Sequence, residues 1–157
     1  MINDRLDVAL AAGAEGVHLP GRGLPPRQAR RLAPHLLVGR SVHSAAEAES
    51  AVEQEVDYLV LGTIFATATH PDTEPGGLDL VRETRARVRL PLLAIGGITL
   101  DNAAATIAAG ADGVAVITAL LNAPDPAAAA DRLVGAVRDG WRTRAANPIP
   151  QEMSGCI

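Results

Sequence analysis

The sequence predicts an α/β protein in which short parallel strands alternate with helices. One segment occurs twice, at residues 11–19 and 108–116, and each copy contains a helix end, a glycine break, an acidic residue and an apolar strand. The apolar runs are short, rich in β-branched residues and do not alternate with polar residues, which is typical of strands in a parallel sheet. Helix-start signals separate these runs. Repeated βα units of this kind form a parallel sheet, either closed as a barrel or open and doubly wound.

The expected elements follow from local signals along the chain. Strands are predicted at residues 16–19, 36–41, 58–62, 92–96 and 113–117, and helices at 25–32, from 44, at 78–88, at 99–109 and from 125. Ser44 and Glu47 form a capping-box pattern, and Asp125 precedes a proline that suits the first helical position. Gly13 and Gly110 suit the left-handed position that follows a helix.

Composition limits the possible partners. The 157 residues carry a net charge of −4, which argues against a nucleic-acid surface, and only 2% of them are aromatic. No apolar run reaches the roughly 18 residues of a membrane helix. A single cysteine and no visible signal peptide favour the cytoplasm. All 14 basic residues are arginine, so Schiff-base chemistry on a lysine of this chain is excluded.

Two glycine-rich strand ends are the main candidates for a phosphate site. Gly96 and Gly97 follow one predicted strand, and Ile117 and Thr118 follow the next. Glycine allows an anion to approach the backbone closely, and backbone N–H groups at strand–helix junctions point towards anions. In (β/α) barrels, phosphate often binds in the loops after the last two strands. We therefore predict that these loops bind phosphate.

Two other strand ends carry reactive side chains. Thr67 and Thr69 follow the strand at 58–62 and offer hydroxyl donors to the same phosphate, whereas His70 and Asp72 lack a third ligand for a metal. His43 comes at the end of the strand at 36–41, where barrel enzymes place catalytic groups, so we predict that it transfers a proton. Spacing alone assigns no role to His18 or His35.

Six short motifs follow one another along the chain, at residues 2–5, 18–22, 39–44, 62–65, 94–99 and 109–116. Together and in this order they resemble the motifs of the family of thiamin phosphate synthase and the thiazole tautomerase TenI. The resemblance implies an eight-stranded (β/α) TIM-type barrel and a thiazole phosphate as the small-molecule ligand. It adds Ser41 and Asn3 to the substrate-binding set and gives His43 the role of acid/base.

Two departures favour the tautomerase over the synthase. The resemblance implies that a synthase holds Mg²⁺ with two aspartates, of which Asp4 is one, but Gly23 stands at the second position. A synthase lysine is replaced by His70. We therefore expect a tautomerase that needs no cofactor and no metal. The alternatives are a synthase, which would use Mg²⁺ and release pyrophosphate, and a degenerate thiazole-phosphate-binding or regulatory fragment.

The resemblance also defines the expected domain. Residues 1–141 form a partial barrel of about strands three to eight, with a stub of the third strand at Met1-Ile2, and residues 142–157 form a flexible tail. Without the first two βα units, the edges beside the strands that start at Gly16 and Gly113 would be unpaired. Unpaired edges favour association, so a homo-oligomer is possible.

Overall fold

The computed structural model describes residues 1–67 and 73–147 as one parallel sheet with helices between its strands. The sheet has six strands in sequential order, β1 to β6, and every neighbouring pair is parallel. The strands are β1 (Ile2–Asn3), β2 (Gly16–Leu19), β3 (Leu37–Val42), β4 (Tyr58–Leu61), β5 (Leu92–Ile95) and β6 (Gly113–Ala115). The helices in these ranges are α1 (Leu6–Ala11), α2 (Pro26–Leu32), α3 (Ala45–Glu53), α4 (Gly77–Arg87), α5 (Leu100–Ala108), α6 (Thr118–Leu121) and α7 (Pro126–Ala146).

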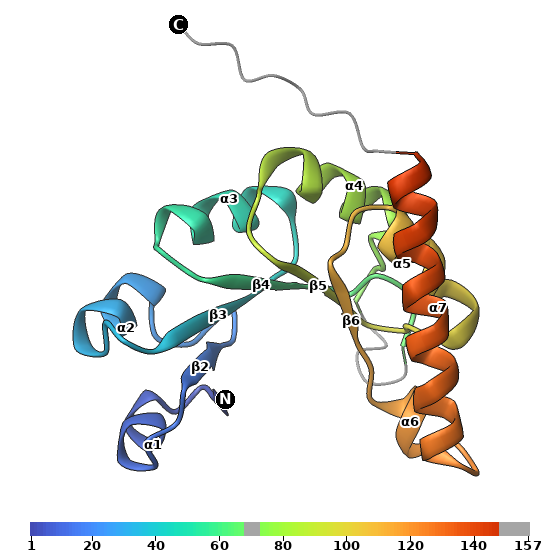
Figure 1. The fold of residues 1–157 in the computed structure, drawn as a ribbon. Coiled ribbons are helices and arrows are strands. Elements are labelled where there is room, and N and C mark those ends of the chain that lie inside the picture. Colours follow the sequence, from blue (N-terminus) through green and yellow to red (C-terminus); the bar gives the residue numbers. More distant parts are fainter. Residues whose placement is uncertain (68–72, 148–157) are drawn as a thin grey trace, which may run out of the picture.

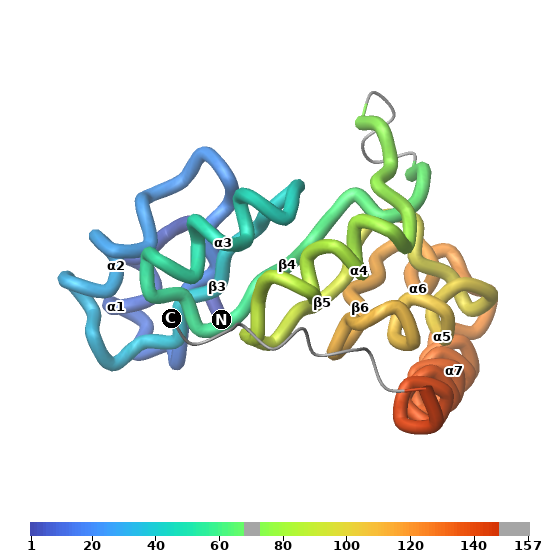
Figure 2. The backbone as a smooth tube through the Cα atoms, turned by 90° about the horizontal axis from the view of Figure 1, so that it is seen from above, coloured from blue at the N-terminus to red at the C-terminus, as the bar shows by residue number. Residues whose placement is uncertain are grey.

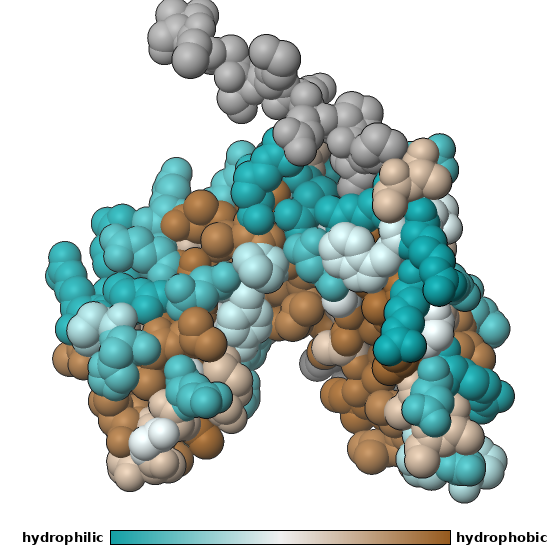
Figure 3. Space-filling view, in the orientation of Figure 1, coloured by the Kyte–Doolittle hydropathy of each residue, from teal (hydrophilic) through white to brown (hydrophobic). Residues whose placement is uncertain are grey.

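The sheet is arched, and the helices lie on its outer side (Figures 1 and 2). Sequential strand order with one helix per connection is the pattern of a (β/α) barrel, here about half closed. The space-filling view shows the hollow beneath the arch (Figure 3). Within the described ranges, no helix combines the length and hydropathy that a membrane span requires.

Burial alternates along the strands because their two faces have different surroundings. Val17, Leu19, Leu59 and Leu61 are fully buried against the helices. The neighbouring His18 is only half-buried, because it lies on the face that borders the hollow. Apolar runs without alternation, as in this sequence, predict strands buried on both faces, whereas in the structure helices cover only the outer face.

Most element boundaries agree with those predicted, and the differences occur at the chain's two ends. β1 pairs with β2 through Ile2 and Asn3, so the expectation of an unpaired edge beside the Gly16 strand is wrong. β6 ends at Ala115 because the chain turns there towards α6, whose first residue is Thr118. Helix α7 continues past Trp141 to Ala146, so the expected start of a flexible tail at residue 142 is also wrong.

One ion pair occurs twice in the sheet with the same sequence separation. Asp57 accepts hydrogen bonds from Arg30 and from the backbone of Val38, and Asp112 accepts from Arg85 and from the backbone of Leu92. Each aspartate immediately precedes a strand, Asp57 before β4 and Asp112 before β6. Its hydrogen bond to the backbone connects that strand to the preceding strand of the sheet. Asp57 thus joins β4 to β3 and Asp112 joins β6 to β5, and Asp112 is the acidic residue of the sequence repeat at residues 108–116.

Candidate active site at the strand ends

A cavity of about 480 Å³ opens at the carboxyl ends of the strands. Eight of the residues predicted for the site line it: Asn3, Ser41, His43, Thr67, Gly96, Gly97, Ile117 and Thr118. Thr69, the other predicted residue, lies outside the described residues, as do His70 and Asp72. With His18 of β2, which also lines the cavity, all six strands contribute to it, because parallel strands deliver their carboxyl ends to the same edge of the sheet.

The loop after β5 is shaped by two glycines with positive φ. Gly96 has φ +97° and Gly97 has φ +61°. A Cβ atom at Gly97 would lie 2.5 Å from the carbonyl oxygen of Ala66, so the backbone can pass there only without a side chain. The loop is fixed further by a hydrogen bond of 3.0 Å from Asn102 Nδ2 to the Gly97 carbonyl, and Asn102 also completes the capping box with Thr99. Bare backbone therefore borders the cavity at this loop.

Ile117 and Thr118, which follow the neighbouring strand β6, form a more open wall of the cavity. Ile117 is half-exposed, and Thr118 begins α6, which is only one turn long. Leu120 and Leu121 both donate their backbone N–H groups to the Ile117 carbonyl. The Thr118 hydroxyl is exposed and lies on the cavity lining, where it can donate to an anion.

His43 is held by its backbone and by one ring nitrogen. Its N–H donates to Glu47 Oε2 over 2.8 Å, and the Ser44 hydroxyl caps α3 by accepting from the Glu47 N–H. The ring Nδ1 donates to the Gly62 carbonyl oxygen, because a carbonyl can only accept. In the neutral ring, Nε2 is then the unprotonated nitrogen. His43 can therefore act as a base through Nε2.

His18, to which spacing in the sequence assigns no role, has two polar partners in the structure. Its Nε2 lies 2.8 Å from Ser41 Oγ and its Nδ1 lies 3.1 Å from Tyr58 Oη. Burial, followed by the positive charge of Arg40, lowers the pKa of His18, which favours the neutral form of the ring. A polar residue between Val17 and Leu19, in an otherwise apolar strand, was the available signal.

The residues near Asp4 do not match a two-carboxylate Mg²⁺ site. Asp4 directly follows β1 and has a positive φ of 63°, and its Oδ1 lies 2.8 Å from the place that a Cβ atom at Gly23 would take. The position beside Asp4 that could carry a second carboxylate is thus occupied by a residue with no side chain. Mg²⁺ requires hard oxygen ligands, and of these two positions only Asp4 supplies one.

A half-closed parallel sheet with outer helices and a cavity at its strand ends defines the (β/α)-barrel class of proteins. The chain belongs to the TMP-TENI family, because the family model described as thiamine monophosphate synthase matches residues 1–120.

Curated relatives and solved structures agree with this family. The chain is 51% identical over 146 residues to the thiamine-phosphate synthase of Methanoculleus marisnigri, covering 89% of this chain and 69% of the relative. It is 53% identical over 132 residues to the thiamine-phosphate synthase of Methanoregula boonei, covering 83% and 61%. The structure of a thiamine phosphate pyrophosphorylase from Pyrococcus furiosus superimposes with a TM-score of 0.81 at 40% identity, covering 88% of this chain and 66% of that one. The chain thus spans about two thirds of the length of these proteins.

Proposed function

We propose that the cavity binds a thiazole phosphate and that the protein acts in thiamine biosynthesis as a thiamine-phosphate synthase. The observation that carries the proposal is the meeting of two phosphate-type loops and the His43 imidazole in one cavity. The names of relatives at 51% and 53% identity favour the synthase over the tautomerase that the sequence analysis preferred. The synthase couples a pyrimidine pyrophosphate to the thiazole phosphate and releases pyrophosphate.

The phosphate group is assigned to the Gly96–Gly97 loop and the Ile117–Thr118 wall. Glycine brings the backbone within reach of phosphate oxygens, and the Thr118 hydroxyl adds a donor. Thr67 lines the same cavity and adds a second hydroxyl. Asn3 and Ser41 lie at the other strand ends, where they would contact the remainder of the ligand.

The tautomerase is kept as a second candidate because of Gly23. The tautomerase reaction only moves protons, so it needs an acid/base group and a phosphate anchor. His43 supplies the acid/base group through Nε2, the ring nitrogen that is not bonded to the Gly62 carbonyl, and such a reaction does not require a carboxylate at Gly23 beside Asp4. The same absence weakens a reaction that needs a metal between two carboxylates.

The first experiment measures the affinity of the full chain for thiazole phosphate by calorimetry, with Gly97→Ala as the test and Gly135→Ala as the control. An alanine at Gly97 places its Cβ against the Ala66 carbonyl, whereas one at Gly135 has nothing within 4 Å. We expect Gly97→Ala to weaken binding by roughly tenfold or more, equivalent to about 1.4 kcal/mol. Equal affinities of the two variants would remove the Gly96–Gly97 loop from the phosphate site.

The second experiment separates the candidates by product. Release of pyrophosphate from both substrates identifies the synthase, and conversion of the thiazole tautomer without pyrophosphate identifies the tautomerase. Binding without either product identifies a ligand-binding fragment. For a tautomerase, His43→Ala should slow proton exchange by roughly 10²-fold or more, and an unchanged rate would exclude His43 as the acid/base.

A further inference from the structure

We propose that Arg40 is a positioning residue that fixes the turn at residues 20–24 over the site and thereby sets the surroundings of His43. The turn joins β2 to α2. The proposal rests on the proposed function only for its activity measurement, since its other readouts need no substrate.

Arg40 bonds both sides of this turn. Its Nη2 donates to the Gly21 carbonyl over 2.7 Å and its Nη1 donates to the Leu24 carbonyl over 3.4 Å. The turn is closed on itself by a bond of 2.8 Å from the Gly23 N–H to the Pro20 carbonyl. A guanidinium carries its donors in a rigid planar fork, so one side chain can hold two carbonyls at a fixed separation.

The turn lies between two functional strand ends. A Cβ atom at Gly21 would lie 3.9 Å from His43 Nε2, the ring nitrogen that stays free of the Gly62 carbonyl. A Cβ atom at Gly23 would lie 2.8 Å from Asp4 Oδ1. The position of this turn therefore decides how much space surrounds the base nitrogen of His43 on one side and the Asp4 carboxylate on the other.

Arg40 acts from the outer face of the sheet. It lies opposite Leu19, the last residue of β2, so its side chain starts beside the point where the turn begins. Ser41, the next residue, lines the cavity, and neighbouring strand residues point to opposite faces. Arg40 itself is not among the residues that line the cavity. Its effect on the reaction would therefore pass through the turn, without contact with the substrate.

The direct test compares Arg40→Ala and Arg40→Lys with the wild-type full chain. Lysine keeps the charge but cannot reproduce the fork, so the two variants separate charge from geometry. The readouts are amide hydrogen exchange at Gly23 and the rate at which diethyl pyrocarbonate modifies His43, located by peptide mass spectrometry. We expect both rates to rise roughly tenfold in both variants, as for the loss of a charge-assisted hydrogen bond.

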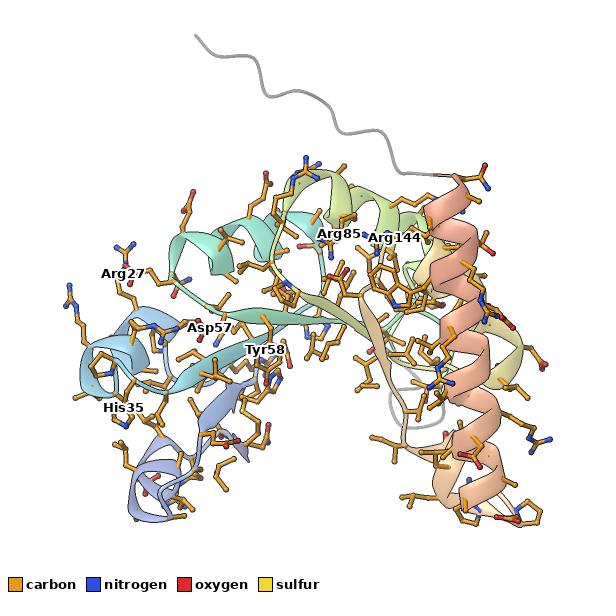
Figure 4. The ribbon with its side chains drawn as sticks, in the orientation of Figure 1. Arg27, His35, Asp57, Tyr58, Arg85 and Arg144 are labelled. Atoms are coloured by element: carbon orange, nitrogen blue, oxygen red, sulfur yellow. The ribbon has the colours of Figure 1, made fainter. Side chains whose placement is uncertain are left out.

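Arg27→Ala is the matched control. Arg27 also donates to a backbone carbonyl, that of Glu53, over 2.7 Å, but it lies on the outer side of α2, away from the cavity (Figure 4). Its loss should leave both readouts unchanged. Rates for the Arg40 variants within twofold of those of Arg27→Ala would overturn the proposal.

Gly21→Ala keeps the test decisive if the Arg40 variants fail to fold. The substitution retains Arg40 and places a methyl group beside His43 Nε2, with no other atom within 4 Å. Modification of His43 should slow severalfold, and an unchanged rate would show that the turn does not border this nitrogen.

When activity is measured, Arg40→Ala should lower kcat while the dissociation constant for thiazole phosphate stays the same. A wild-type chain that neither binds nor converts substrate would instead refute the proposed function and leave the hydrogen-exchange test intact.

Discussion

Gly39 in β3 and Tyr58 in β4 lie opposite each other in the sheet, and the tyrosine ring occupies the space that a side chain at residue 39 would need. His18 lies opposite Gly39 on the other side, in β2. The missing side chain in the middle strand allows His18 and Tyr58 to meet across it, with ring centroids 5.7 Å apart. Figure 4 shows Tyr58 on the inner side of the arch.

Gly39→Ala should therefore destabilise the protein, because the new Cβ atom overlaps the Tyr58 ring. Overpacking of this kind costs about 1–3 kcal/mol, measured as the free energy of unfolding in urea. Combining Gly39→Ala with Tyr58→Ala removes the ring that blocks the new Cβ atom. The double variant should therefore lose less free energy of unfolding than the sum of the two single variants. Strict additivity would show that the ring is not what excludes a side chain at residue 39.

The His18 pKa predicts a specific loss of stability in acid. Because burial and Arg40 lower this pKa below its usual 6.5, the unfolded chain binds the proton more readily than the folded one. Above pH 6.5 both states are neutral and His18 contributes nothing to the pH dependence. As the pH falls from 6.5 towards the lower folded pKa, stability is lost.

His18→Gln should lose less stability than the wild type over this pH interval. The measurement is urea unfolding at several pH values, with an NMR titration of the His18 ring as an independent check. A titration midpoint at or above 6.5 in the folded protein would contradict the prediction.

The two repeated ion pairs, Arg30–Asp57 and Arg85–Asp112, should differ in how much they contribute to the free energy of unfolding. The Arg85 side chain is 7% exposed, whereas that of Arg30 is 19% exposed, and Asp112 also accepts a bond of 3.2 Å from Arg144 in α7. Figure 4 shows Arg85 and Arg144 beside each other. Asp112→Ala leaves a buried guanidinium without its carboxylate and should cost about 3–5 kcal/mol.

Asp57→Ala is the matched control, because its partner Arg30 is more exposed than Arg85. This variant should lose only about 1 kcal/mol of its free energy of unfolding. Both variants are compared by their free energies of unfolding. Equal losses would show that the burial of Arg85 does not determine the cost.

Two glycines in α7 should respond in opposite directions to alanine. A Cβ atom at Gly140 would lie 2.5 Å from the Ala104 carbonyl oxygen in α5, whereas Gly135 has nothing within 4 Å. Gly135→Ala should stabilise the helix by roughly 0.5–1 kcal/mol, from the higher helix propensity of alanine. Gly140→Ala should lower the thermal midpoint, because α5 and α7 must separate, and an increase in both variants would contradict this close packing.

Local signals in the sequence determined the elements and much of the candidate site. The strand at residues 16–19 was predicted with its observed bounds, and Ser44 and Asp125 cap helices as expected. These features depend on neighbouring residues alone. Six of the eight predicted residues on the cavity could be found because they follow a strand, and parallel strands bring their ends together. Asn3 and Ser41, which lie within β1 and β3, were found only through the family resemblance.

Only the tertiary structure decided the relationships between strands. His18 gained partners because Gly39 leaves the space through which Tyr58 reaches it, and the sequence does not contain that distance. Arg40 holds the turn at residues 20–24 through backbone carbonyls, which carry no residue-type signal. Gly23 lies beside Asp4 only after β1 and β2 have paired. A residue's chemistry can be predicted from its type and local pattern, whereas its partners depend on packing between segments that are far apart in the chain.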